Sequence, residues 1–159
     1  MTALEALQKA PLFREFTETG LKIFASIALE KAIPPGTPLF VENMVGESLF
    51  IVKSGTVKIT QKTGEGEKEL AVLGAGEHLG ELALLAKSVR LVSAVASTRC
   101  EVLELTQRDF VKLQPQKPQA CLKLALAIAQ DLSQRAAESR DVLRELALRE
   151  LAAKKPAGP

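Results

Sequence analysis

Residues 76–91 read GEHLGELALLAKSVRL, and the interpretation of the whole chain starts from them. Gly80 directly precedes Glu81, and the LALLA run that follows favours a helix of one or two turns. The start of a helix offers backbone N–H groups that attract an anion. Gly80 lets the backbone come close to a ligand, and Arg90 supplies a planar, charged fork for a phosphate. The stretch therefore predicts an anion site.

Glu81 extends this prediction from a phosphate to a ribose phosphate. A carboxylate does not bind a phosphate, but it accepts hydrogen bonds from sugar hydroxyls. An alternative interpretation is structural: Arg90 pairs with Glu81 or Glu77, and the glycines only turn corners. The residues of the segment alone leave both interpretations open.

The composition indicates one packed domain, or one domain plus an extra helix. The chain has 159 residues, of which 47% are hydrophobic and 25% are charged, which is enough for a core. A net charge of +2 lacks the basic excess of a dedicated nucleic-acid binder. No apolar run is long enough to span a membrane and no secretory signal is recognisable, so we expect a cytoplasmic protein. Cys100 and Cys121 are expected to be reduced packing residues.

The middle of the chain predicts an antiparallel β structure. Residues 37–105 contain many short apolar runs with turns between them, which is typical of a barrel or jelly roll. Residues 48–62, SLFIVKSGTVKITQK, are interpreted as one longer strand with a bulge or sharp bend at Gly55. Residues 2–13 and 17–34 precede this zone and are interpreted as short helices.

The C-terminal zone is predicted to be helical. Thr106 is an expected N-cap, with Asp109 three residues later. Residues 119–153 contain no glycine or proline, which predicts one long helix. A narrow seam on this helix suits a partner helix, although its first half can equally pack on its own barrel. The seam consists of Leu132, Ala136, Ser139, Leu143 and Leu146.

The predicted fold class is therefore mainly β with flanking helices and a long C-terminal helix. Residues 1–117 form the domain with its N-terminal helices and β-barrel. Residues 118–153 form the long helix, a candidate dimer helix, and residues 154–159 form a disordered tail.

Several motifs in the same order resemble the cyclic nucleotide-binding domain family. This is the sensor domain of the catabolite activator proteins and of protein kinase A regulatory subunits. The resemblance covers about residues 7–146, and its order and spacing agree across the chain. It is carried by IPPGTPLFVEN, SLFIVKSGTVKI, LGAGEHLGELALL and CEVLELTQRDFVKL.

The resemblance implies a cyclic nucleotide-binding β-barrel, a double-stranded β-helix or jelly roll, with a phosphate-binding cassette inside it. In that cassette Gly80 lets the chain turn against the ligand, and Glu81 accepts the ribose 2′-hydroxyl. The backbone amides of Leu82 and Ala83 face the cyclic phosphate, and Arg90 pairs with its charged oxygen. The long helix resembles the family's final helix, which often forms the dimer and caps the base.

Leu91 is the main departure from the family pattern. The family usually has Ser or Thr there, and its hydroxyl binds the phosphate. Losing one such bond costs about 1.5–3 kcal/mol, roughly ten- to a hundredfold in affinity. The N–H of Leu91 remains available to the ligand. A register that uses Ser93 instead requires a deletion before CEVLEL, so Leu91 stands.

The other departures are smaller. Val89 replaces a frequent proline, which makes the cassette less rigid, and Asn43-Met44 replaces a Gly-Asp pair at a turn. On the last helix, Arg135 and Ala136 lie where the base is read. Arg135 either stacks on a purine or bonds its edge, or it is solvated.

The remaining features point away from catalysis and DNA binding. His78 is the only histidine, so we expect a surface role rather than a metal cluster. No nucleophile and base form a plausible arrangement, so no enzyme activity is expected. The sequence ends at Pro159 without room for the helix-turn-helix that follows the long helix in the activators, so direct DNA binding is not expected.

The first functional hypothesis is a stand-alone cyclic mononucleotide receptor for cAMP or cGMP, with no further cofactor. Binding would change a homodimer surface on the C-terminal helix, or the surface for an unidentified protein partner. The second hypothesis is a degenerate domain that serves as a nucleotide-independent dimerisation or docking module. The third is a different ligand, such as a dinucleotide, with Leu91 packing on a base.

Overall fold

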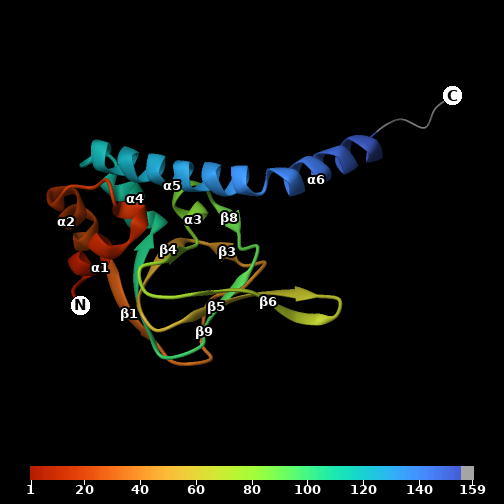
Figure 1. Cartoon of the computed structure of the whole chain (residues 1–159). Helices are drawn as coiled ribbons and strands as arrows, with labels where there is room; N and C mark the ends of the chain where they lie inside the picture. Colours follow the sequence, from red (N-terminus) through yellow and green to blue (C-terminus); the bar gives the residue numbers. More distant parts are fainter. Residues whose placement is uncertain (155–159) are drawn as a thin grey trace.

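Two four-stranded antiparallel sheets pack against each other in the computed structural model, which describes residues 1–154 (Figure 1). The first sheet has the order β1-β10-β4-β7: Leu29–Ile33, Cys100–Thr106, Ser48–Ser54 and His78–Leu79. The second has the order β2-β9-β5-β6: Pro38–Phe40, Ser93–Ala96, Val57–Thr63 and Gly66–Leu73. A third, two-stranded sheet pairs β3, Val45–Gly46, with β8, Ser88–Val89.

An apolar core lies between the two larger sheets. Phe50 and Val52 of β4 share it with Val57 of β5 and with Ala94 and Ala96 of β9. The mainly β fold with flanking helices and a jelly-roll arrangement is confirmed. The sheets are not closed into a barrel, so the β-barrel of the prediction is better described as a sandwich of this jelly-roll type.

Gly55 divides what the sequence suggested as one strand. β4 belongs to the first sheet and β5 to the second, so the chain changes sheets within the SGT turn. Gly55 has a φ of +84°, and a Cβ there would lie 2.9 Å from the Cα of Cys100. The predicted sharp bend is therefore correct, but the run is two strands rather than one.

The second N-terminal helix is shorter than predicted. The helix α2 spans Glu18–Ile27, and the chain then forms β1, Leu29–Ile33, which was expected to be helical. β1 pairs with β10 along its whole length, from Leu29 opposite Glu104 to Ile33 opposite Cys100. This long-range ladder overrides the helical preference of the local sequence, which a local pattern does not reveal.

The helices collect at one end of the sheets around a second apolar core (Figure 1). They comprise α1, Ala3–Lys9; the 3₁₀ turn η1, Pro11–Phe13; α2; α3, Leu82–Leu85; and α4, Gln107–Leu113. Phe13 and Phe24 are fully buried in this core, and Cys121 also lies within it. The Thr106 side chain accepts a hydrogen bond from the N–H of Asp109 at 3.1 Å, which confirms the predicted cap of α4. Both cysteines are buried and unpaired, as expected.

The long C-terminal helix is confirmed, with an interruption at Ser139. The helix α5 spans Pro118–Glu138 and α6 spans Arg140–Ala153, and Ser139 between them has φ −101° and ψ 13°. Leu124 and Ile128 of α5 are fully buried, so the first half of the helix packs on its own domain. The seam positions on α6, Leu143 and Leu146, are exposed.

Of the predicted tail, residues 154–159, only Lys154 lies within the described residues. No helix among residues 1–154 combines the length and apolar character needed to cross a membrane.

We predict that Gly55→Ala lowers the free energy of unfolding by about 1–3 kcal/mol, because a Cβ there meets the backbone at a left-handed φ. Urea denaturation measures the change. Gly64→Ala is the matched control, since a Cβ at Gly64 meets no atom within 4 Å. Equal destabilisation by the two variants would contradict this account of the bend.

Candidate functional site

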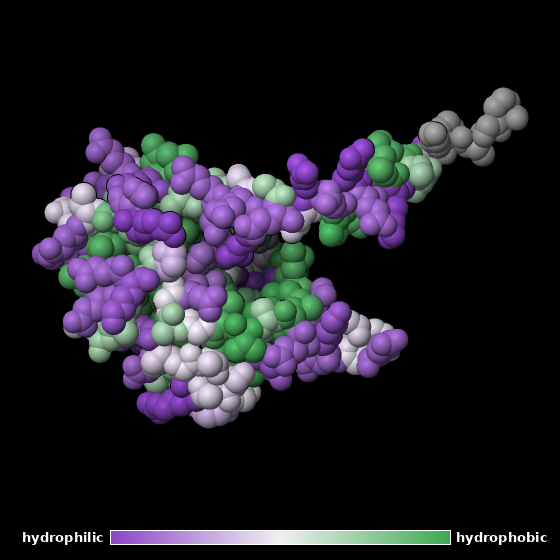
Figure 2. All heavy atoms as spheres, in the orientation of Figure 1, coloured by the Kyte–Doolittle hydropathy of each residue, from purple (hydrophilic) through white to green (hydrophobic). Residues whose placement is uncertain are grey.

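A cavity of about 470 Å³ lies between the second sheet, the 78–92 segment and α5. Its apolar wall includes Ile59, Ala71 and Leu73, and its polar groups include Glu81 and Arg90. Figure 2 shows the hollow under the overhanging C-terminal helix, with hydrophobic residues gathered on the sheet side. Six of the seven predicted site residues line this cavity: Gly80, Glu81, Leu82, Arg90, Leu91 and Arg135. The seventh, Ala83, does not.

Arg90 is a buried cation that carbonyl groups hold in place. It is 9% exposed, and it donates from Nη2 to the Ser48 carbonyl at 2.7 Å and from Nη1 to the Gly80 carbonyl at 3.2 Å. The ring of Phe40 lies 4.1 Å from the guanidinium carbon. Burial lowers the pKa of the Arg90 guanidinium, and the negative charges of Glu81 and Glu104 oppose this shift. The group nevertheless stays charged.

The charge of Arg90 has no ion-pair partner within residues 1–154. Its Nε is buried and donates to no group of that part of the chain. This contradicts the alternative in which Arg90 pairs with Glu81 or Glu77. A buried cation with an unsatisfied donor favours an anion as its partner.

Two glycines make room for the Arg90 side chain. A Cβ at Gly46 would lie 2.6 Å from Arg90 Nε. A Cβ at Gly80 would lie 2.9 Å from the Ser48 carbonyl and would also meet Arg90 Nη1, and Gly80 has a φ of +77°. Gly80 therefore serves the arginine directly, in addition to its predicted role of turning the cassette.

The turn before β3 fixes the backbone of Arg90. The N–H of Arg90 donates to the Met44 carbonyl at 2.7 Å, and the N–H of Asn43 donates to the Arg90 carbonyl at 2.8 Å. Asn43 has a φ of +69°, a conformation that asparagine tolerates better than most residues. The departure at Asn43-Met44 does concern a turn, as expected, and this turn positions the arginine.

Glu81 directly precedes α3, the short helix predicted for this segment. Its side chain is 8% exposed and faces the cavity. The amide of Ala83 donates to the Gly80 carbonyl at 3.1 Å, so it closes the turn instead of facing the cavity as the resemblance implied. Leu82 lines the cavity, with its side chain partly exposed.

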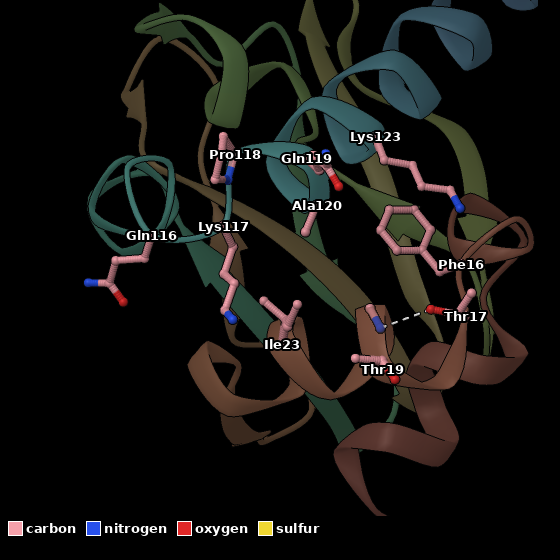
Figure 3. Close-up of a pocket in the computed structure, with 11 residues that line it drawn as sticks. Phe16, Thr17, Thr19, Ile23, Gln116, Lys117, Pro118, Gln119, Ala120 and Lys123 are labelled. Carbon is pink, nitrogen blue, oxygen red and sulfur yellow. Dashed lines mark hydrogen bonds between the residues drawn. The ribbon is translucent and has the colours of Figure 1, made fainter.

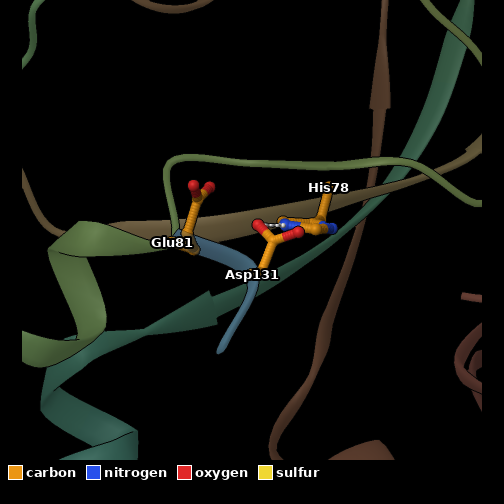
Figure 4. Close-up of side chains that lie close together, drawn as sticks. All are labelled: His78, Glu81 and Asp131. Carbon is orange, nitrogen blue, oxygen red and sulfur yellow. Dashed lines mark hydrogen bonds and ion pairs between the residues drawn. The ribbon is translucent and has the colours of Figure 1, made fainter. Parts of the chain in front are cut away.

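Glu81, His78 and Asp131 form a cluster between the cassette and α5 (Figure 4). Their ligand atoms lie within 4.8 Å of one another, a grouping that can hold a metal ion. The guanidinium of Arg135 occupies this position: it lies 3.3 Å from Glu81, 3.0 Å from Asp131 and 3.4 Å from His78 Nε2. We therefore assign the cluster to binding the Arg135 guanidinium rather than a metal ion.

The expectation of a surface role for His78 is wrong. Its side chain is 9% exposed, and Nε2 lies 3.2 Å from Asp131 Oδ2. The sequence could not show this pair, because the partners are 53 positions apart. Arg135 is half exposed and ion-paired with Glu81 and Asp131, so it is not simply solvated, and its contact with a purine stays a prediction.

The positions around Leu91 support the chosen register. The Leu91 residue is 74% exposed at the cavity, and its carbonyl accepts a hydrogen bond from Gln61 at 3.4 Å. The hydroxyl of Ser93 accepts a hydrogen bond from the Glu42 N–H at 2.9 Å and lies outside the cavity lining. Ser93 is therefore not the missing hydroxyl.

A second cavity, of about 430 Å³, lies between the start of α2 and the junction of α4 and α5 (Figure 3). Its cations, Lys117 and Lys123, are exposed, and Lys123 lies 5.1 Å from the ring centroid of Phe16. No buried charged group lines this cavity, so we assign it no ligand.

Residues 30–116 match the model of the cyclic nucleotide-binding domain. The chain belongs to this family. The domain is 32% identical over 127 residues to the Cyclic AMP receptor protein of Thermus thermophilus, which covers 79% of this chain and 59% of that protein. It is 33% identical over 111 residues to the cGMP-dependent protein kinase egl-4 of Caenorhabditis briggsae, covering 67% of this chain and 15% of that kinase. The domain thus spans a limited part of these relatives.

Solved structures agree with the assignment. The domain superposes on the Thermus thermophilus Catabolite Activator Protein with a TM-score of 0.76 and 32% identity, over 87% of this chain and 63% of that one. A cyclic nucleotide-binding domain from Methylobacillus flagellatus superposes with a TM-score of 0.75 and 25% identity, over 98% and 84%.

Sequence reasoning missed the residues that support Arg90 and Glu81 from other elements. Arg90 is contacted by Gly46, Ser48 and Phe40. The ion pair between Glu81 and Arg135 is extended by Asp131 and His78. Gly46, close before the apolar strand β4, was the one local signal for this support. Its function depends on strand pairing that the sequence does not show.

We predict that Asp131→Asn loosens α5 from the domain, because the substitution removes the charge that pairs with His78 and Arg135. Hydrogen exchange should become severalfold faster around residues 129–138. Stability should fall by less than about 1 kcal/mol, since partly exposed ion pairs contribute little. Asp141→Asn is the control, because the side chain of Asp141 is 93% exposed. Identical exchange in the two variants would rule out the cluster as a link to α5.

Proposed function

We propose that this domain is a cyclic mononucleotide receptor that binds cAMP or cGMP in the cavity of Arg90. The observation that carries this proposal is the buried guanidinium of Arg90: among residues 1–154 no carboxylate pairs with it and no group accepts from its Nε. A cyclic phosphate has one negative charge, which can pair with the guanidinium, and several oxygens, one of which can accept from Nε. Glu81, on the same cavity, accepts a ribose hydroxyl.

The apolar part of the cavity suits a purine. Ile59, Ala71 and Leu73 line it, and Leu132 faces it from α5. A volume of about 470 Å³ lies in the usual range for small-molecule sites. The names of the relatives include both cAMP and cGMP proteins, which supports the ligand class and makes both nucleotides the ones to test.

Signal transfer is proposed to pass through Arg135. In the present structure its Nη1 lies 3.3 Å from Glu81 Oε1. A ribose hydroxyl that donates to the same carboxylate competes with Arg135, and so changes how α5 is held. We propose a regulatory rather than a catalytic function, in the cytoplasm.

The exposed leucines of α6 fit a homodimer or a protein partner. Leu143, Leu146, Leu148 and Leu151 are each about half exposed or more, on a helix with no buried residue. This surface also favours a second candidate function, a docking module that works without nucleotide. Partner or dimer formation that is the same with and without cyclic nucleotide, and in a variant of Arg90, would favour that second function.

We predict that Arg90→Gln weakens cyclic nucleotide binding at least about a hundredfold, because it removes the buried positive charge proposed to pair with the phosphate and a charge-assisted donor. Isothermal titration with cAMP and cGMP measures the affinity, and circular dichroism verifies the fold. Arg149→Ala on α6 is the control and should bind like the wild type. Binding that survives Arg90→Gln unchanged would contradict the proposal.

The position of Arg90 can be tested apart from its charge. We predict that Gly46→Ala weakens binding about tenfold or more, since a Cβ there pushes against Nε and moves the guanidinium. Gly64→Ala provides the control in the same titration. Wild-type affinity in Gly46→Ala would show that the packing around Arg90 does not set the ligand geometry.

A further inference from the structure

Ser88 lines the same cavity as Arg90 and was not among the predicted site residues. We propose that the Ser88 hydroxyl donates to the ligand phosphate, in place of the hydroxyl that Leu91 lacks. This inference rests on the proposed function, because it assigns one more contact to the same anion.

The pairing of β3 with β8 places Ser88 beside the guanidinium. Ser88 is directly opposite Gly46 in this antiparallel pair. Residues directly opposite each other carry their side chains on the same face of a sheet, with Cβ atoms about 4.5–5.5 Å apart. A Cβ at Gly46 would point at Arg90 Nε, 2.6 Å away. The Ser88 side chain therefore lies on the face that holds the guanidinium.

The alternation along the strand leads to the same result. Pairing continues past β8, since the N–H of Arg90 donates to the Met44 carbonyl at 2.7 Å. In an extended segment, residues two positions apart share a face, so Ser88 goes with Arg90 and Val89 goes with Leu91. The exposures agree: Arg90 is buried and Ser88 is partly buried, whereas Val89 is 50% and Leu91 74% exposed.

The unsatisfied Nε of Arg90 is the donor that we expect an anion oxygen to reach. This donor is buried and lies against the face that Gly46 and Ser88 share. An oxygen that accepts from Nε is then within reach of a short side chain opposite Gly46. Serine is the shortest side chain that carries a hydroxyl donor, and a hydroxyl bonded to a phosphate makes a charge-assisted contact.

The test compares cAMP affinities by isothermal titration of the full chain. Ser88→Ala should bind roughly ten- to a hundredfold more weakly than the wild type, the loss expected for one hydrogen bond to a charged group. Ser88→Thr keeps the hydroxyl and should stay within a few-fold of the wild type. The control Ser97→Ala, at an exposed position away from the cavity, should show no change. Equal affinity of Ser88→Ala and the wild type overturns the inference.

A second measurement separates this inference from the proposed function. If the wild type binds neither cAMP nor cGMP, the proposed function fails, and inorganic phosphate then replaces the nucleotide in a thermal-shift titration. A smaller rise of Tm in Ser88→Ala than in the wild type and Ser97→Ala supports the hydroxyl contact. Equal rises, or none in any of the three proteins, overturn it.

Discussion

A buried positive charge, with no carboxylate partner in the part of the chain that the structure describes, sets the main constraint on this domain. Removing a guanidinium from water is costly unless other groups replace its hydration. Here the carbonyls of Ser48 and Gly80 accept from two of its N–H groups, and the guanidinium carbon lies over the ring of Phe40. These groups come from strands in both large sheets and from the cassette, so the position of the charge depends on the whole jelly-roll fold.

The same constraint explains why small residues surround the arginine. Gly46 and Gly80 lie where any Cβ would meet the guanidinium, and the turn at Asn43 holds its backbone. One residue after Gly80, Glu81 reaches the cation of α5. The proposed anion site and the C-terminal helix are thus joined through the adjacent residues Gly80 and Glu81. The interruption at Ser139 separates the part of the helix that packs on the domain from α6, whose leucines are exposed.

Local patterns in the sequence predicted what depends on local structure. The turn of helix after Glu81, the cap at Thr106 and the long helix after the prolines follow from propensity and capping chemistry. The order of several motifs, through their family resemblance, placed Gly80, Glu81 and Arg90 in one site, and the structure brings all three to one cavity.

Features that depend on pairing between distant segments could not be predicted in this way. The local sequence of β1 predicts a helix, and only its pairing with β10 makes it a strand. The role of Gly46 depends on the pairing of β3 with β8. His78 looks like an isolated surface residue until α5 brings Asp131 to it. In each case the deciding contact joins residues that a search for local periodicity never compares.

A crystal structure of the full chain grown with cAMP tests the central claim most directly. We predict a phosphate oxygen within hydrogen-bond distance of Arg90 Nε and a ribose hydroxyl bonded to the Glu81 carboxylate. A ligand bound elsewhere, or a phosphate in this cavity that leaves the Arg90 Nε without a partner, would contradict it.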